Sequence, residues 1–259
     1  MPKITAHDLD LFFEEEGHGE PLVLIHGLGS SHAMFKQEAE HFKEHFRVIS
    51  YDARGHGQSG KPARYTLNDH IEDLRALLDH LEIDKAHVLG VSMGSYIAQG
   101  FALAHPDRVD KLILVVSKSN GKTSSTQELL QRYEEELEGM DELETMEYLS
   151  KYMFHNLKAV GRWQADLAQI EKPLSITEQA AANKALEGFD FRAALPTIAA
   201  ETLIISGTHD GLNPPERGKE IASFIPGSHF VEFGQSGHAP NVEEPEKFLQ
   251  VIGEFLAES

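Results

Sequence analysis

The sequence predicts an α/β protein built on a mostly parallel central sheet with helices on both faces. Two observations lead to this fold class. Short apolar runs alternate with stretches of helical periodicity, and glycine-containing turns join the two kinds of segment. A chain of 259 residues is long for one domain, but single α/β units of this size are common.

Apolar runs of strand length predict strands at residues 22–26, 47–52, 87–91, 111–117, 202–206 and 229–233. Helices are predicted where apolar residues recur every three to four positions, at residues 67–81, 93–104, 216–224 and 245–257. Before the first helix, Thr66 and Asp69 have the spacing of a capping box. Pro214, Pro215 and Pro245 suit helix starts, where no amide donor is needed.

The alternation of strand and helix stops between residues 118 and 196, where helical periodicity dominates. We expect this segment to be a helical cap inserted into a core of residues 1–117 and 197–259, since a structureless loop of that length is improbable. In an open parallel sheet, sites form beyond the carboxyl ends of the strands. The insertion leaves from such an end and is placed to cover a site there. Acidic residues in its first predicted helix indicate a solvated face: Glu134, Glu135, Glu136 and Glu138.

The composition excludes several classes of function. Without cysteine, the chain has no disulfide, thiolate metal site or cysteine nucleophile. A formal net charge of −19 argues against nucleic acid and anionic membranes as partners. The apolar runs are too short to span a bilayer. No apolar stretch near the N-terminus fits a secretion signal, so we expect a cytoplasmic protein.

The sharpest local motif is Gly-Val-Ser-Met-Gly at residues 90–94. It follows an apolar strand and precedes a helix, which is the context of a sharp strand-to-helix turn. Side chains at Gly90 and Gly94 would clash in such a turn. The turn exposes Ser92 at the strand end, where the following helix points its positive N-terminus. The motif therefore predicts Ser92 as a nucleophile.

A serine hydroxyl needs a base that accepts its proton, and His238 is the histidine best placed for this role. It lies in a loop after the strand predicted at residues 229–233. His209 is the main alternative, because it adjoins an acid. That acid, Asp210, follows the strand predicted at residues 202–206, and we expect it to orient the histidine.

Acyl transfer also needs N–H donors for the negative charge that develops on the carbonyl oxygen. The Met93 amide directly follows the proposed nucleophile. We assign the second donor to the Leu28 amide, in the turn His26-Gly27-Leu28-Gly29, where the glycines let the backbone approach closely.

With these motifs, the chain resembles the α/β-hydrolase superfamily over essentially its whole length. Nucleophile, acid and histidine follow one another in the chain order of that fold. The resemblance implies that residues 52–59 form a structural loop beside the oxyanion region. One departure is Ser95, where many relatives carry a second glycine; it bears on helix packing. Four separated segments carry the resemblance: residues 26–29, residues 52–59, the turn around Ser92, and Gly237-His238 with Glu243 and Pro245.

Within the superfamily, the chain is most similar to small bacterial carboxylesterases and 3-oxoadipate enol-lactonases. This resemblance implies hydrolysis of small carboxylic esters through an acyl-enzyme. The serine at position 92 excludes the dehalogenases and epoxide hydrolases that use an aspartate nucleophile. Two alternatives stay open: a lactonase or C–C bond hydrolase with the same triad, and a sensor or ligand-binding module with slow turnover.

Substrate-binding residues are predicted in the insertion, although the same side chains also suit its own core: Met140, Met153, Phe154 and Trp163. The expected partner is a small-molecule ester, and the predicted reaction requires no metal or organic cofactor. His41 and His45 lie four residues apart on a predicted helix. No third ligand accompanies them, so no metal site is predicted.

Overall fold

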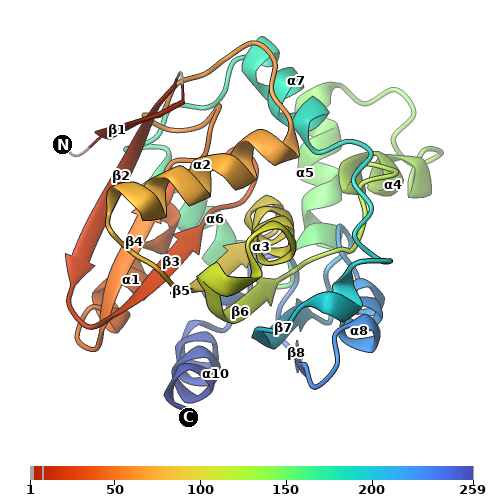
Figure 1. The fold of residues 1–259 in the computed structure, drawn as a ribbon. Coiled ribbons are helices and arrows are strands. Elements are labelled where there is room, and N and C mark those ends of the chain that lie inside the picture. Colours follow the sequence, from red (N-terminus) through yellow and green to blue (C-terminus); the bar gives the residue numbers. More distant parts are fainter. Residues whose placement is uncertain (1–2, 8, 259) are drawn as a thin grey trace.

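The described residues form one eight-stranded sheet in the order β1-β2-β4-β3-β5-β6-β7-β8 (Figure 1). The structure is a computed structural model that describes residues 3–7 and 9–258, so the first two residues of the N-terminal stretch considered above lie outside it. The strands are β1 (Lys3–Ala6), β2 (Leu9–Gly17), β3 (Glu20–Ile25), β4 (Phe46–Tyr51), β5 (Ala86–Val91), β6 (Val109–Val115), β7 (Glu201–Gly207) and β8 (His229–Phe233).

The six strands from β4 to β8 in the sheet order are parallel to one another, which confirms the predicted mostly parallel architecture. All six predicted strands are present, with ends that differ by a few residues. The structure adds β1 and β2, which pair antiparallel at one edge. There β2 also pairs antiparallel with β4, with Phe13 opposite Tyr51.

Helices cover both faces of the sheet. On one face, α2 (Leu67–His80), α3 (Met93–Ala104) and α8 (Pro215–Phe224) pack on alternate strand residues such as Val23 and Val88. On the other, α1 (Lys36–Phe42) and α10 (Pro245–Ala257) pack on the intervening residues such as Leu22 and Leu89. Successive strand residues point to opposite faces, so one sheet supplies two apolar cores. Figure 1 shows α2 and α3 in front of the sheet and α10 below it.

Local signals in the sequence explain several helix boundaries. The predicted capping box is confirmed at the start of α2, where Thr66 and Asp69 exchange hydrogen bonds. Pro215 and Pro245 each begin a helix, as predicted, and Pro240 begins the short α9 (Pro240–Glu243). Three short 3₁₀ helices complete the core: η1 (His32–Phe35), η2 (Pro106–Arg108) and η3 (Leu195–Thr197).

Residues 118–196, here called the helical insertion, carry four α-helices between β6 and β7. The first ends at Arg132, earlier than the periodicity suggested, and Glu134–Glu136 lie in the turns that follow it, exposed as expected. No helix in the described ranges has the length and apolar character needed to cross a membrane. The helices are α4 (Ser125–Arg132), α5 (Glu142–Met153), α6 (Leu157–Leu167) and α7 (Ile176–Ala185).

One buried acid lies beneath the insertion. Glu38, on α1, is 2% exposed, and its Oε2 atom has no hydrogen-bond partner. Burial raises the pKa of Glu38 from 4.5 to about 7, while a hydrogen bond with Asn241 opposes the shift. The carboxyl therefore ionises at a much lower pH in the unfolded chain than in the folded one.

This difference in pKa predicts a pH-dependent loss of stability. Between about pH 4.5 and 7 the unfolded state loses the Glu38 proton before the folded state does, so the free energy of unfolding falls as the pH rises. Glu38→Gln removes this effect, and we expect it to stabilise the protein by about 2–3 kcal/mol at pH 8 and by much less at pH 5. Urea unfolding at both pH values measures the difference. Glu44→Gln, at an exposed neighbouring position, is the control, and an equal gain for Glu38→Gln at both pH values contradicts the account.

Candidate active site

Three residues that were predicted to act together meet at the carboxyl edge of the sheet. Ser92 follows β5, Asp210 follows β7, and His238 follows β8. The Oγ atom of Ser92 lies 3.0 Å from Nε2 of His238, and Nδ1 of His238 lies 2.8 Å from Oδ2 of Asp210. Parallel strands place their carboxyl ends at one edge, so residues separated by 146 positions in the chain come within hydrogen-bond distance.

Two glycines set the geometry of the turn at Ser92. The Ser92 backbone has φ 52° and ψ −115°, a combination that residues other than glycine rarely adopt. A Cβ atom at Gly90 would lie 2.2 Å from the Gly94 carbonyl oxygen. One at Gly94 would lie 2.0 Å from the Ile25 carbonyl oxygen. Neither position has room for a side chain, and the turn projects the Ser92 hydroxyl beyond the strand end.

The buried carboxylate of Asp210 is fixed from two sides. Its Oδ1 atom accepts hydrogen bonds from the amides of Leu212 and Asn213, both at 2.9 Å. Its Oδ2 atom is left to accept the Nδ1 proton of His238. An imidazole that is protonated on Nδ1 carries its lone pair on Nε2. The arrangement therefore turns the basic nitrogen of His238 toward the Ser92 hydroxyl.

One buried carboxylate ties the loop around the histidine to the helical insertion. Glu243 Oε1 accepts hydrogen bonds from the amides of Gly237 (2.9 Å) and Ala239 (3.2 Å), on either side of the imidazole-bearing residue. Glu243 Oε2 accepts from the amides of His155 and Asn156, both at 2.7 Å, in the turn between α5 and α6. Glu243 thus satisfies four backbone donors in two separate segments.

Backbone hydrogen bonds strengthen this junction. The amide of His238 donates to the Met153 carbonyl at 2.7 Å, and the amide of Gly211 donates to the Tyr152 carbonyl at 2.8 Å. The loops that carry the acid and the histidine are therefore both joined to the end of α5. A displacement of α5 would move the histidine.

Leu28 and Met93 are the residues whose amides were predicted to stabilise an oxyanion. Both residues line the cavity that contains Ser92. Within the described part of the chain, neither amide donates to a protein acceptor. An N–H group without a protein acceptor can donate to a negatively charged oxygen of a bound molecule.

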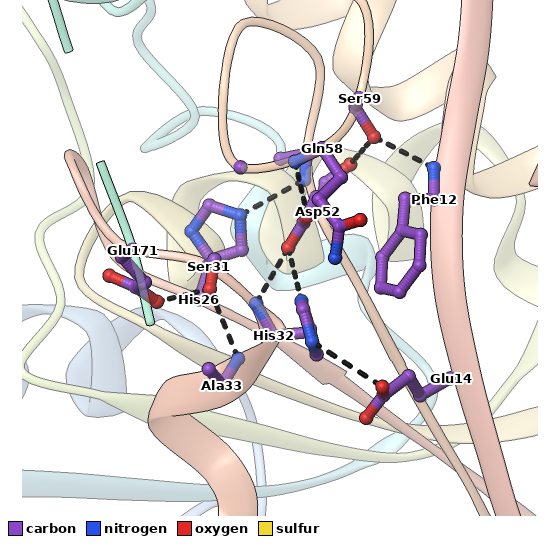
Figure 2. Close-up of polar contacts among 12 residues, drawn as sticks. Phe12, Glu14, His26, Ser31, His32, Ala33, Asp52, Gln58, Ser59 and Glu171 are labelled. Carbon is purple, nitrogen blue, oxygen red and sulfur yellow. Dashed lines mark hydrogen bonds and ion pairs between the residues drawn. The ribbon is translucent and has the colours of Figure 1, made fainter. Parts of the chain in front are cut away.

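Residues 52–59 brace the loop that carries Leu28. Nε2 of His26 accepts the Ala53 amide at 2.9 Å, and burial together with the neighbouring His56 lowers the pKa of His26 to about 3, so the ring is a neutral acceptor. The Asp52 carboxylate accepts hydrogen bonds from the amide and ring Nδ1 of His32, at 2.8 and 2.7 Å, and from the amide of Gln58, at 2.6 Å. Figure 2 shows these groups around the carboxylate.

The helical insertion reaches the same loop from the other side. The hydroxyl of Ser31 donates to the carboxylate of Glu171, which follows α6 (Figure 2). Burial raises the pKa of Glu171, and the hydrogen bond from Ser31 opposes that shift. The loop beside the proposed oxyanion donors is thus held by both the core and the insertion.

A cavity of about 340 Å³ opens beside Ser92. Three of the four predicted substrate-binding residues line it: Met153, Phe154 and Trp163. Met140 is not among the described residues that line this cavity, and its predicted role stays a prediction. It precedes the 12-residue helix α5, at whose other end Met153 lies, so the two are separated by about 18 Å along the helix.

Several polar residues of the cavity lie outside the sequence prediction. Asn213 donates to the Tyr96 hydroxyl at 2.9 Å and to the Val116 carbonyl at 2.7 Å. Burial raises the pKa of Tyr96 to about 12, so its hydroxyl remains neutral. Lys118 also lines the cavity. A signal for Lys118 and Asn213 was available, because both follow parallel strands within a few residues.

Other candidate residues lie away from the cavity. The alternative base His209 is exposed and stacks on His155, with ring centres 4.1 Å apart. His41 lies on α1, but the helix ends at Phe42, so the predicted helical pair with His45 does not form.

Among the described residues, one exposed group has metal-ligand atoms close together, formed by Glu201, His229 and Glu258. Lys111 Nζ lies 3.0 Å from Glu201 there, and its positive charge competes with a cation.

The structure combines a mostly parallel sheet that is covered on both faces with a serine on a sharp turn at the carboxyl edge of that sheet. This combination is typical of the α/β-hydrolase fold. Residues 20–245 match the family model described as alpha/beta hydrolase fold, and the chain belongs to this family. The resemblance seen in the sequence is thereby confirmed.

Proteins named as hydrolases, lactonases or esterases are similar to this chain over almost its whole length. The AB hydrolase superfamily protein YisY of Bacillus subtilis is 30% identical over 262 residues, covering 97% of each chain. The 3-oxoadipate enol-lactonase 1 of Acinetobacter baylyi is 31% identical over 244 residues, covering 91% of this chain and 88% of its own. The structure of a thermophilic esterase from Thermogutta terrifontis has a TM-score of 0.84 and 31% identity, covering 98% and 97% of the two chains.

The left-handed backbone at Ser92 predicts an unusual order of stability. Ser92→Gly relieves the strain, which is worth about 1–3 kcal/mol, while Ser92→Ala retains it. The added freedom of the unfolded glycine variant offsets about 0.4–1 kcal/mol. We therefore expect the glycine variant to be the more stable of the two by about 1 kcal/mol in urea unfolding. Ser223, an exposed position in α8, is the control: there the alanine variant should be more stable than the glycine variant. If the glycine variant is the less stable one at Ser92 as well, the backbone at Ser92 stores no strain.

The Glu243 junction predicts a second change in stability. In Glu243→Gln, one oxygen becomes an NH₂ group that cannot accept, so two buried amides lose their acceptor. We expect the free energy of unfolding to fall by about 2–4 kcal/mol. Amide hydrogen exchange should accelerate on one side of the junction, at residues 155–156 or at residues 237 and 239. Glu246→Gln, at an exposed site on α10, is the control, and unchanged exchange in Glu243→Gln would show that the junction is not a constraint.

Proposed function

We propose that this protein is a serine hydrolase of small carboxylic esters, with Ser92 as nucleophile, His238 as general base and Asp210 as the residue that orients the base. The observation that carries the proposal is the unbroken contact from Ser92 through His238 to Asp210, at 3.0 and 2.8 Å. Those distances are within hydrogen-bond reach of a nucleophile, its base and the orienting acid.

The proposed reaction has two halves. Ser92 Oγ bonds to the ester carbon while its proton passes to Nε2 of His238, and the oxyanion is stabilised by the amides of Leu28 and Met93. The bond to the alcohol breaks as His238 returns the proton to it, which leaves an acyl-enzyme. Water then attacks by the same route and releases the acid and free Ser92.

We further propose that residues 118–196 act as a cap on a core of residues 1–117 and 197–259. The apolar side chains of Met153, Phe154 and Trp163 support this role, because the insertion contributes them to the cavity wall. A cavity of about 340 Å³ is at the small end of ligand sites, which favours small substrates.

A lactonase is the second candidate, since the same triad opens a cyclic ester. The observation in its favour is the 31% identity to an enol-lactonase over 91% of this chain. Ring opening retains the alcohol within the acyl-enzyme, so hydrolysis yields one product instead of two.

We expect wild-type protein to hydrolyse p-nitrophenyl acetate and butyrate faster than the octanoate, because of the size of the cavity. Ser92→Ala and His238→Ala should each lower kcat by about 10⁴-fold or more, and Asp210→Asn by about 10³–10⁴-fold. Steady-state kinetics with the three esters and a small lactone measures these effects, with Asp107→Asn, at an exposed site, as the control.

Each outcome separates the candidates. Turnover of lactones without turnover of esters replaces the first proposal with the second. Equal activity in wild type and Ser92→Ala removes both, because neither reaction proceeds without the nucleophile.

A further inference from the structure

A buried lysine that the proposed ester hydrolysis does not use lines the cavity beside Ser92. Lys118 lies in the loop after β6, next to β5, whose end carries Ser92. Both residues line the one cavity, together with Tyr96, one helical turn after Ser92. The ammonium nitrogen of Lys118 lies 5.9 Å from the centre of the Tyr96 ring.

The ammonium group of Lys118 has N–H bonds that donate to no acceptor among the described residues. The residue is only 5% exposed, and its Nζ donates one hydrogen bond, to the Thr123 carbonyl at 2.7 Å. An ammonium group has three N–H bonds, so two have no hydrogen-bond acceptor among the described residues. A buried charge is costly unless it is paired, which makes this group ready to receive an anionic partner.

The start of α4 adds further donors to the same wall. Ser124, Ser125 and Thr126 all line the cavity. Ser124 is the N-cap residue, but its side chain does not cap the helix. Within the described ranges, the amides of Ser125 and Thr126 have no protein acceptor. Unpaired amides at a helix N-terminus favour a negative group, and the residues that carry them line the same cavity as Lys118.

The charges around Lys118 leave it positive at neutral pH. Burial lowers its pKa to about 8, while the carboxylate of Glu128 raises it and the guanidinium of Arg217 lowers it. Glu128 is itself paired with Arg217 at 2.9 Å. Glu187 is the one acid among the described residues that line the cavity, and its side chain is 56% exposed and paired with Lys184.

We propose that Lys118 and the N-terminus of α4 form a subsite for a carboxylate group carried by the substrate. This inference rests on the proposed function and narrows it: the preferred substrates are monoesters of short dicarboxylic acids. A formal net charge of −19 repels such anions from the molecule as a whole, so their binding depends on a local cation. The remaining cavity wall, with Met153, Phe154 and Trp163, suits the apolar part of the substrate.

The test compares charged and neutral esters of equal length. Monoethyl esters of succinate, glutarate and adipate are paired with ethyl esters of the corresponding monocarboxylic acids, and the ratio of the two kcat/KM values is measured. Lys118→Met and Lys118→Gln are expected to lower this ratio by about 10- to 100-fold, the effect of one charge-assisted hydrogen bond. Lys122→Met, which removes a cation with a 63% exposed side chain nearby, should change the ratio by less than about twofold.

An unchanged ratio in both Lys118 variants, or an equal loss of both substrates, overturns the subsite. Retained hydrolysis of the neutral ester, abolished by Ser92→Ala, would then still support the proposed function. If the wild type hydrolyses no ester, the proposed function fails, and binding of glutarate to Ser92→Ala by calorimetry decides on the subsite. The subsite is supported if Ser92→Ala binds glutarate about 10-fold or more tightly than the Ser92→Ala, Lys118→Met double variant does. Equal binding by the two proteins, or no detectable binding, overturns the subsite.

Discussion

The backbone at Ser92 is held in a left-handed conformation that persists only where the surroundings enforce it. Its amide donates to the Val115 carbonyl on β6 at 2.9 Å, while its carbonyl accepts from the amide of Ser95 in α3 at 2.9 Å. On the other side, Gly94 packs against the Ile25 carbonyl at the end of β3. Both strands that flank β5 therefore define the direction of the Ser92 hydroxyl, and the loops after β7 and β8 need only reach that point.

The helical insertion is joined to the loops of Asp210 and His238 by backbone and carboxylate hydrogen bonds. Glu243 connects the turn after α5 to the loop of His238, and the carbonyls of Tyr152 and Met153 accept from the two loops. The same turn supplies Met153 and Phe154 to the cavity. Substitutions elsewhere in the insertion can therefore reshape the cavity while this junction preserves the position of the imidazole.

The sequence predicts those parts of the protein whose signals are local. The turn around Ser92 needs glycines at fixed positions, and Asp210 and His238 each follow a short apolar strand, so these residues were found together with the parallel sheet. β2 was missed because its second half reads Glu14, Glu15, Glu16, which gives no alternation at the edge of the sheet. Composition also does not tell which end of α5 faces the cavity, so the sequence does not separate Met140 from Met153. Lys118 directly follows a predicted strand, but its burial in the cavity wall becomes visible only when β5, β6 and α4 are placed in space.

The central claim is that Ser92 is a nucleophile activated by His238, and covalent labelling tests it most directly. Wild-type protein is treated with diethyl p-nitrophenyl phosphate and examined by intact-mass and peptide mass spectrometry. The account predicts a single diethylphosphoryl group, located on Ser92, and labelling at least about 100-fold slower in His238→Ala because the hydroxyl then lacks its base. Labelling at another residue, or at Ser92 with the same rate in both proteins, would contradict it.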